Sequence, residues 1–160
     1  YRISLSKGND IISIEHEMQL IDNYLSIQKL RYVEYLDYHL DFDQKILKYQ
    51  IPKLTLQPIV ENSIYHGLKQ KDEKGLLKIK GCFEQDTIKI EVIDDGIGMT
   101  EEQISKVLYR PTKDQKSTDF GVYNVDSRLN LLYGEQFGIS IESKVKEYTK
   151  VIVRLPAIPI

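Results

Sequence analysis

The sequence contains one cysteine, no tryptophan and no long apolar run. Because Cys82 is alone among the 160 residues, a disulfide within the chain is excluded, and we expect this side chain to be buried in a protein from a reducing compartment. No apolar run approaches the ~18 residues that a membrane-spanning helix needs, and no signal peptide is visible. Since the chain begins at Tyr1 rather than Met, we expect a fragment, with any membrane anchor upstream.

An excess of basic residues is also missing. The net charge of -2 gives no reason to expect nucleic-acid binding. Hydrophobic residues make up 41% of the chain and charged residues 29%, enough for a real core and an ordinary solvated surface. This length predicts one domain, or one domain with a helical extension.

The first predicted element is a helix that begins at Ser13. Ser13 is a candidate N-cap, and Glu15 and Glu17 fall in the first turn, where they complement the helix dipole. Apolar residues form two adjoining stripes, Ile14, Met18, Ile21 and Leu25 beside Leu20, Tyr24 and Ile27. So broad a face favours two neighbours, the domain on one side and a partner helix on the other; the alternative is a surface helix on its own core.

The periodicity of the remaining chain predicts a mixed sheet with helices on one face. We expect a strand at 34–43, a helix at 54–67, a hairpin at 77–83 and 88–92, a short helix at 100–108, a polar stretch at 111–119, a helix from Gly121, and strands around 139–141 and 151–155. Pro52 precedes the second helix and Gly67 is its expected end. The helix from Gly121 carries one apolar face, made of Val122, Val125, Leu129 and Leu132.

A polar triplet, Glu61, Asn62 and His66, interrupts the apolar run of the second helix. A buried amide at Asn62 must find a partner, and its oxygen is a candidate Mg²⁺ ligand because this ion takes only one or two protein oxygens beside water and phosphate. The alternative is a satisfied core amide. His66, four residues later, lies on the same helical face.

Asp94 ends the strand at 88–93 and opens a turn with Gly96 and Gly98. A carboxylate in this position can accept the exocyclic amino hydrogen of adenine, and the glycines allow the backbone to approach the ring closely. Taken singly, an Asp-Asp-Gly sequence is more often an ordinary turn.

Gly121 begins a helix whose first N–H groups and positive dipole end suit phosphate oxygens. The polar stretch before it, with Lys113 and Lys116, suits a mobile lid over a nucleotide. A surface loop followed by an ordinary helix start is the alternative.

Together these residues resemble the ATP-binding domain shared by gyrase, the Hsp90 chaperones, histidine kinases and MutL. The LytS/YesM branch of sensor histidine kinases is indicated by three runs: NYLSIQKLR at 23–31, LQPIVENSIYHG at 56–67 and GVYNVDSRL at 121–129, which continues to Tyr133-Gly134. The resemblance implies an α+β fold, a two-layer α/β sandwich of the Bergerat type. It also implies that residues 1–34 end a dimerisation hairpin as its second helix and that 35–160 form the catalytic domain.

The resemblance also assigns the site. Asn62 would bind Mg²⁺. Glu61, by its position next to Asn62 alone, is the candidate to orient or deprotonate the acceptor imidazole. The nucleotide, ATP, would be contacted by Asn62, Tyr65, His66, Lys69, Asp94, Gly96, Ile97, Gly98, Met99, Gly121, Val122 and Thr149.

Three departures from the family pattern predict reduced nucleotide affinity. Tyr65 stands where the family usually has Lys, and Asp119 stands where a glycine precedes Gly121 by two residues. Only Thr149 remains of the usual Gly-x-Gly-Thr turn. We expect Lys69, Lys113 or Lys116 to compensate.

The predicted function is the ATP-binding catalytic domain of a two-component sensor histidine kinase. None of His16, His39 and His66 has the context of a phosphoacceptor, so we expect the acceptor upstream. The implied partners are a response regulator and a second copy of the protein, with no nucleic acid, and the implied location is the cytoplasmic side of a membrane-anchored bacterial sensor. A non-catalytic regulatory or dimerisation module is the alternative. A gyrase- or MutL-type ATPase is disfavoured because Pro58 stands where that type has its basic glutamate.

Overall fold

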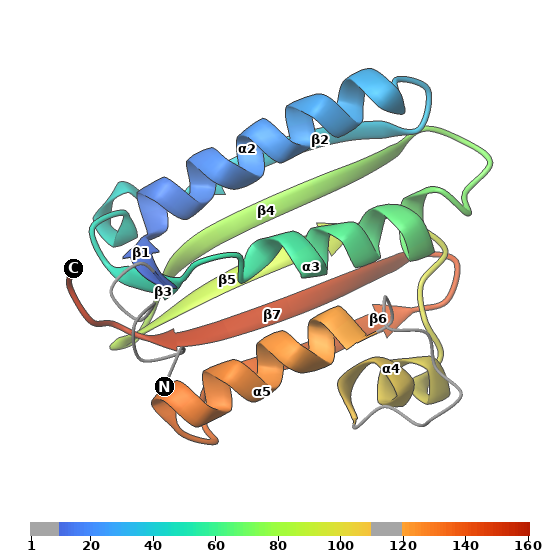
Figure 1. Cartoon of the computed structure of the whole chain (residues 1–160). Helices are drawn as coiled ribbons and strands as arrows, with labels where there is room; N and C mark the ends of the chain where they lie inside the picture. Colours follow the sequence, from blue (N-terminus) through green and yellow to red (C-terminus); the bar gives the residue numbers. More distant parts are fainter. Residues whose placement is uncertain (1–9, 110–119) are drawn as a thin grey trace.

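A computed structural model describes residues 10–109 and 120–160 (Figure 1). The predicted polar stretch at 111–119, with Lys113, Lys116 and Asp119, lies outside these residues. The elements in chain order are β1 (Ile11–Ser13), α2 (Ile14–Arg31), β2 (Leu36–Phe42), the 3-10 helix η1 (Gln44–Ile46), β3 (Gln50–Pro52), α3 (Leu56–Asn62), the π-helix η2 (Ser63–Leu68), β4 (Gly75–Glu84), β5 (Thr87–Asp94), α4 (Glu101–Leu108), α5 (Gly121–Tyr133), β6 (Gly138–Lys144) and β7 (Tyr148–Pro156).

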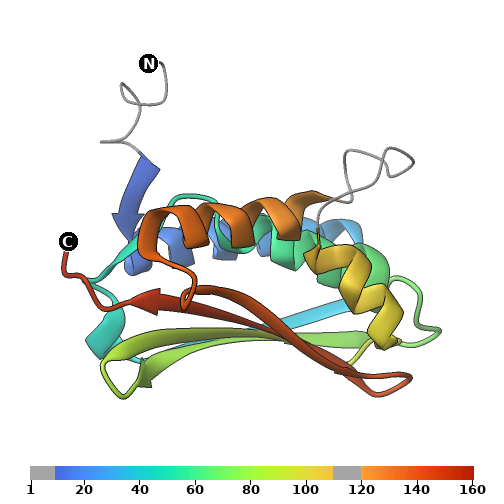
Figure 2. The same cartoon turned by 90° about the horizontal axis from the view of Figure 1, so that it is seen from below.

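Five strands form the main sheet in the order β2-β4-β5-β7-β6. The β2–β4 pair is parallel and the other three pairs are antiparallel. Helices α2, α3 and α5 form a second layer over one face of this sheet, as Figure 2 shows from the side. The predicted two-layer α/β sandwich is thereby confirmed. A small antiparallel pair, β1 with β3, was not predicted.

The hydrophobic core fills the space between the two layers. Every second residue of the central strands points toward the helices, which explains the apolar alternation, and these side chains are fully buried: Ile88, Ile90, Val92, Val151, Val153 and Leu155. From α5 the core receives Val122, Val125 and Leu129, whereas Leu132 is 49% exposed. The buried part of the predicted apolar face therefore does not include Leu132. Cys82 is exposed, contrary to its predicted burial.

Helix α2 belongs to the same core as the sheet. Its residues Ile14, Ile21 and Leu25 are buried with the strands, and the β1–β3 pair ties its start to the domain. The predicted boundary between residues 34 and 35 therefore does not separate two cores. Of the second predicted stripe, Tyr24 packs against the core and Ile27 is 64% exposed, and Leu30 beyond it is 84% exposed. A partner on this side therefore stays a prediction.

Within the part of the chain described, no helix is both long and apolar enough to cross a membrane.

Candidate nucleotide site

The candidate site begins where α3 changes its winding. After Asn62 the helix continues as the π-helix η2, in which the N–H of Lys69 donates to the carbonyl of Ile64 at 2.9 Å, five residues back. Such wide turns are rare and cluster at functional sites. Asn62, His66 and Gln70, from this segment and the residues just after it, line the wall of a single cavity.

This cavity measures about 400 Å³, the size of a small-molecule site. It is lined by Asn62, His66, Gln70, Ile97, Gly98, Met99, Gln103, Lys106 and Val107. The structure thus brings together Asn62 and His66 from the helix with the predicted Ile97, Gly98 and Met99 from the loop after β5. Gln70 and the wall supplied by α4 were missed, because the sequence predicted a short helix at 100–108 but not which surface it covers.

Asp94 is a buried carboxyl at the end of β5, 1% exposed. Its Oδ1 accepts the N–H of Gly96 at 3.0 Å. Burial raises the pKa of Asp94 to about 6, against the opposing effect of the Gly96 N–H and the nearby Ser63 hydroxyl. A buried carboxyl with so few protein donors keeps acceptor capacity for a ligand, which makes Asp94 a functional-site candidate.

The glycines of the site allow backbones to meet around Asp94. A Cβ on Gly67 would lie 2.7 Å from the Oδ1 of Asp94, and a Cβ on Gly96 would collide with the Gly67 carbonyl. Gly67 is therefore not the helix end that the sequence predicted, since the helix runs on to Leu68. Gly98, at φ +73, packs against the carbonyl of Lys144 and accordingly needs both the positive φ and the missing side chain.

Thr149, on β7, supports the loop that follows β5. It is the cross-strand partner of Asp94 and is 3% exposed. Its hydroxyl lies 2.9 Å from that of Ser143, which accepts the N–H of Met99 at 2.8 Å. Thr149 therefore holds the Met99 loop against the sheet, and it is not one of the cavity-lining residues.

Tyr65 and Lys69 lie outside the cavity lining, against the end of α2. The Nζ of Lys69 is 5.1 Å from the ring centroid of Tyr32 and 5.4 Å from that of Tyr65, and the two rings meet edge to face at 6.5 Å. These are cation–π and aromatic contacts of ordinary length. The predicted contacts of Tyr65 and Lys69 with a nucleotide stay predictions, and these ring contacts count against them.

Glu61 also lies outside the cavity lining. Its Oε1 accepts a hydrogen bond from Gln57 at 3.0 Å. Burial, and next the nearby Glu61 charge, raise the pKa of the Tyr24 hydroxyl on α2. The Glu61 carboxylate is thus turned toward α2 and its own helix.

Gly121 and Val122 pack α5 against the rest of the helical layer. A Cβ on Gly121 would lie 3.0 Å from the Cβ of Pro58 on α3, and Val122 is 3% exposed. The N-cap residue Phe120 makes no side-chain capping hydrogen bond to this helix. The start of α5 is therefore close to α3 but is not part of the cavity lining.

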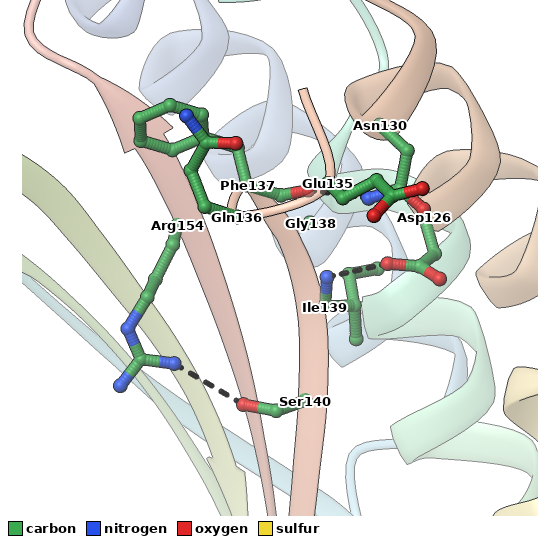
Figure 3. A pocket seen from close by; sticks show the side chains of 9 residues that line it. All are labelled: Asp126, Asn130, Glu135, Gln136, Phe137, Gly138, Ile139, Ser140 and Arg154. Carbon is green, nitrogen blue, oxygen red and sulfur yellow. Dashed lines mark hydrogen bonds between the residues drawn. The ribbon is translucent and has the colours of Figure 1, made fainter. Parts of the chain in front are cut away.

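A second cavity, of about 260 Å³, lies along the later part of α5 (Figure 3). Its polar groups are engaged with the loop they line: Asp126 accepts the N–H of Ile139 at 2.7 Å, and Asn130 donates to the carbonyl of Phe137. Arg154 donates hydrogen bonds to the side chains of Ser140 and Glu84, both at 3.3 Å. These hydrogen bonds hold the turn between α5 and β6 in place, so the polar groups of this cavity already have partners within the protein.

A cation held by the main site would rest on few protein ligands. No group of three or more His, Cys, Asp or Glu side chains among the described residues can hold a metal ion. Mg²⁺ does not require one, because it keeps several waters and is often bound through phosphates and one or two protein oxygens. The half-buried amide of Asn62 at the cavity wall fits that requirement.

Comparison with known proteins identifies the family and the fold. Residues 51–159 match the family described as histidine kinase-, DNA gyrase B-, and HSP90-like ATPase. The chain belongs to this family. Membership confirms the predicted resemblance and makes the domain one of a nucleotide-binding fold.

Three curated relatives are sensor proteins. The chain is 30% identical over 155 residues to the sensor histidine kinase YesM of Bacillus subtilis, covering 97% of this chain and 26% of YesM. It is 31% identical over 156 residues to the sensor histidine kinase BtsS of Escherichia coli, covering 98% and 26%, and 32% identical over 146 residues to the sensor protein LytS of Streptococcus mutans, covering 89% and 25%. The chain therefore spans about a quarter of each relative.

Solved structures agree on the fold. The catalytic domain of histidine kinase ThkA superposes with a TM-score of 0.68 at 13% identity, covering 93% of this chain and 95% of that domain. The mycobacterial sensor histidine kinase MprB gives 0.64 at 14% identity, covering 94% and 98%. A match of 93% leaves fewer unmatched residues than the 18 of α2, so part of α2 lies within the shared fold.

Proposed function

We propose that this chain is the ATP-binding catalytic domain of a two-component sensor histidine kinase. In this proposal the domain donates the γ-phosphate of ATP to a histidine upstream of residue 1, for transfer to a response regulator. The observation that carries it is Asp94, a buried carboxyl with spare acceptor capacity beside a cavity walled by Asn62.

The residues of the site divide the work of binding. Asp94, once ionised, accepts the exocyclic amino hydrogen of adenine, while Ile97, Met99 and Val107 give the cavity apolar walls for the ring. The side-chain oxygen of Asn62 would hold Mg²⁺. When bound, this ion neutralises charge on the phosphates, and the rest of phosphoryl transfer is largely a matter of positioning.

The acceptor histidine is placed outside this chain. His16 and His39 are exposed on α2 and β2, and His66 lines the candidate nucleotide cavity itself. Glu61, next to Asn62 and outside the cavity lining, is the candidate to orient the incoming imidazole. This role rests on its position beside Asn62.

The same proposal includes two partners and a location. The exposed apolar residues Ile27, Leu30 and Val33 of α2 and the following turn would meet a second copy of the protein, with residues 1–34 continuing its dimerisation hairpin. The response regulator would receive the phosphoryl group. The domain would work on the cytoplasmic side of a membrane-anchored bacterial sensor.

Calorimetric titration of the chain with ATP and with ADP, each with and without Mg²⁺, tests the binding step. We expect both nucleotides to bind and Mg²⁺ to strengthen ATP binding. No heat of binding at millimolar nucleotide would reject the proposal. Incubation with radiolabelled ATP tests the transfer step: acid-labile label should appear on a longer chain that includes the upstream helix and not on this one.

One observation favours a non-catalytic, weakly binding module instead. Lys69, a predicted phosphate contact, is held between the rings of Tyr32 and Tyr65 and is not among the cavity-lining residues. If it stays there, the triphosphate loses one nearby cation. Binding of ATP no tighter than that of adenosine would support this alternative.

A further inference from the structure

Glu17 is a buried carboxylate that the proposed phosphoryl transfer does not use. The residue lies on α2 and is 2% exposed. Its Oε1 accepts the N–H of Leu54 at 3.0 Å, and its Oε2 accepts those of Thr55 and Leu56 at 2.8 and 3.0 Å. These three amides are where α3 begins, so a side chain of one helix caps the first turn of another.

The first turn of α3 has no cap of its own. Thr55 is the N-cap residue, yet its hydroxyl donates to the carbonyl of Pro52 at 2.6 Å and makes no capping bond. The preceding Leu54 adopts φ +62, a conformation that costs energy for a branched side chain and must be held by its surroundings. Glu17 provides that hold by accepting the Leu54 N–H.

Arg128 of α5 fixes the same segment from the other side. Its Nη2 donates to the carbonyl of Lys53 at 2.8 Å and lies 3.4 Å from the Thr55 hydroxyl oxygen. The charge of Arg128 also opposes the rise in the pKa of Glu17 that burial causes. Residues 53–56 are thus clamped between α2 and α5, and α3 leads from this clamp directly to Asn62.

We propose that Glu17 is a positioning residue for Asn62, which it holds in place by fixing the origin of α3 to α2, with Arg128 as the second support. A serine at residue 55 would cap α3 without burying a charge. A carboxylate from α2 caps α3 and also fixes α3 against α2, so the buried charge has a structural role. The inference rests on the proposed function, in which Asn62 is the Mg²⁺ ligand.

The variant Glu17→Gln tests this with little change in size. The quantity to measure is the factor by which Mg²⁺ raises ATP affinity, by calorimetry on the whole chain. We expect that factor to fall about fivefold, within the range that residues acting through a packed network produce. Affinity for ADP without Mg²⁺, which reports on Asp94, should change by less than about twofold.

Two control variants separate positioning from loss of stability. Glu15→Gln alters an exposed carboxylate on the same helix, and Leu155→Ala weakens the core at the end of β7 away from Asp94. Neither should change the Mg²⁺ factor. The inference is overturned if Leu155→Ala lowers that factor as much as Glu17→Gln does.

A double variant tests whether Glu17 acts through Asn62. In an Asn62→Ala background, Glu17→Gln should have no further effect on the Mg²⁺ factor, whereas independent effects would add. If Glu17→Gln does not fold, Arg128→Lys replaces it, because lysine keeps the charge but loses the planar fork that reaches Lys53. Additive losses with either variant would refute the positioning role.

Failure of the proposed function would look different. If the ATP affinity of the wild-type chain does not depend on Mg²⁺, Asn62 is not the metal ligand. The placement of Asn62 can then still be tested without a ligand. The NMR signal of the Asn62 side-chain amide should then shift in Glu17→Gln and stay unchanged in Glu15→Gln. An unshifted signal in both would refute the clamp itself.

Discussion

The two ends of α3 differ in how fully the nearby buried carboxyl groups are hydrogen-bonded. At its start, the Glu17 carboxylate accepts three backbone N–H groups. At its far end the helix widens into η2 beside an open cavity, and Asp94 accepts one backbone N–H, from Gly96. A carboxylate with three backbone donors fixes structure, whereas one with a single backbone donor keeps acceptor capacity and is the candidate for binding.

The same contrast appears in the influences on the pKa values of Glu17 and Asp94. Burial is the largest influence on both and raises the pKa of each. For Glu17 three amide donors and the charge of Arg128 work against that rise, and for Asp94 one amide and the Ser63 hydroxyl do. Glu17 therefore has a nearly complete set of hydrogen-bond partners, whereas Asp94 has room for a further donor.

The largest expected effect comes from breaking the anchored end. Glu17→Ala leaves three amide groups without acceptors, two of them in buried hydrogen bonds, and we expect the free energy of unfolding to fall by about 3–5 kcal/mol. Urea unfolding at pH 7 measures it. The matched change Glu15→Ala removes an exposed ion pair with Lys48 and should cost less than about 1 kcal/mol. Similar losses in both variants would contradict the contrast between buried clamp and surface pair.

At the binding end, Asp94→Asn should act in the opposite direction on stability. The pKa of Asp94 is about 6 in the folded protein against 3.8 for the free side chain. Protonated Asp94 therefore favours the folded state below pH 3.8, and this contribution is lost as pH rises through 6. A neutral amide avoids the cost of the buried charge, so we expect a gain of up to about 3 kcal/mol at pH 7.

The same variant should lose function while it gains stability. Removing the charge-assisted hydrogen bond to adenine is expected to cost about 1–3 kcal/mol of ADP affinity. Urea unfolding at pH 7 and at pH 3.5, with ADP titration at pH 7, checks both halves. A variant less stable than wild type at pH 7, or one that binds ADP equally well, would contradict this view of Asp94.

Asn62→Ala should remove ligand stabilisation with little change in the free protein. At a nucleotide concentration of about 100 times Kd, binding stabilises a protein by about 2.7 kcal/mol. We expect thermal melts of the variant to lose most of the shift that Mg²⁺-ATP causes, since the amide lies on the cavity wall. Equal losses of ligand-free stability and of the ligand shift would instead make Asn62 a structural amide.

The smallest expected effect is a pH dependence of adenine binding. Because Asp94 must be ionised to accept the amino hydrogen, a pKa of about 6 predicts that ADP affinity rises about tenfold from pH 5 to pH 7. Titration of the ADP phosphate itself contributes to any such change. Asp94→Asn isolates that contribution, so a slope as steep in the variant as in the wild type would exclude Asp94 as its origin.

Most of the fold could be predicted because its long elements carry clear periods. The alternation of Ile88, Ile90 and Val92 marks a strand with one buried face, and the long helices and strands follow one another in the predicted order. The β1–β3 pair was missed because three-residue strands are too short to show a period. The π-helix was missed because its extra residue leaves no pattern in the sequence.

The site was partly predictable, for a similar reason. Asn62 and His66 stand four residues apart, so helical spacing alone places them on one wall. Glu17 was read as a first-turn acid that complements the helix dipole, an explanation that spacing supports equally well. Its actual partners lie 37 to 39 residues away in sequence, and only the tertiary fold brings them together.

The π-helix holds one residue more than an ordinary α-helix would need over the same span. Deleting one residue between Asn62 and Gly67 would let this segment close as an α-helix, and the side chains after it would keep about their present directions. Deleting two would rotate every later side chain by about 100° around the axis, and a residue with a Cβ would then face the carboxyl of Asp94 where Gly67 now lies. In related genes we therefore expect this segment to be shorter by one residue at most.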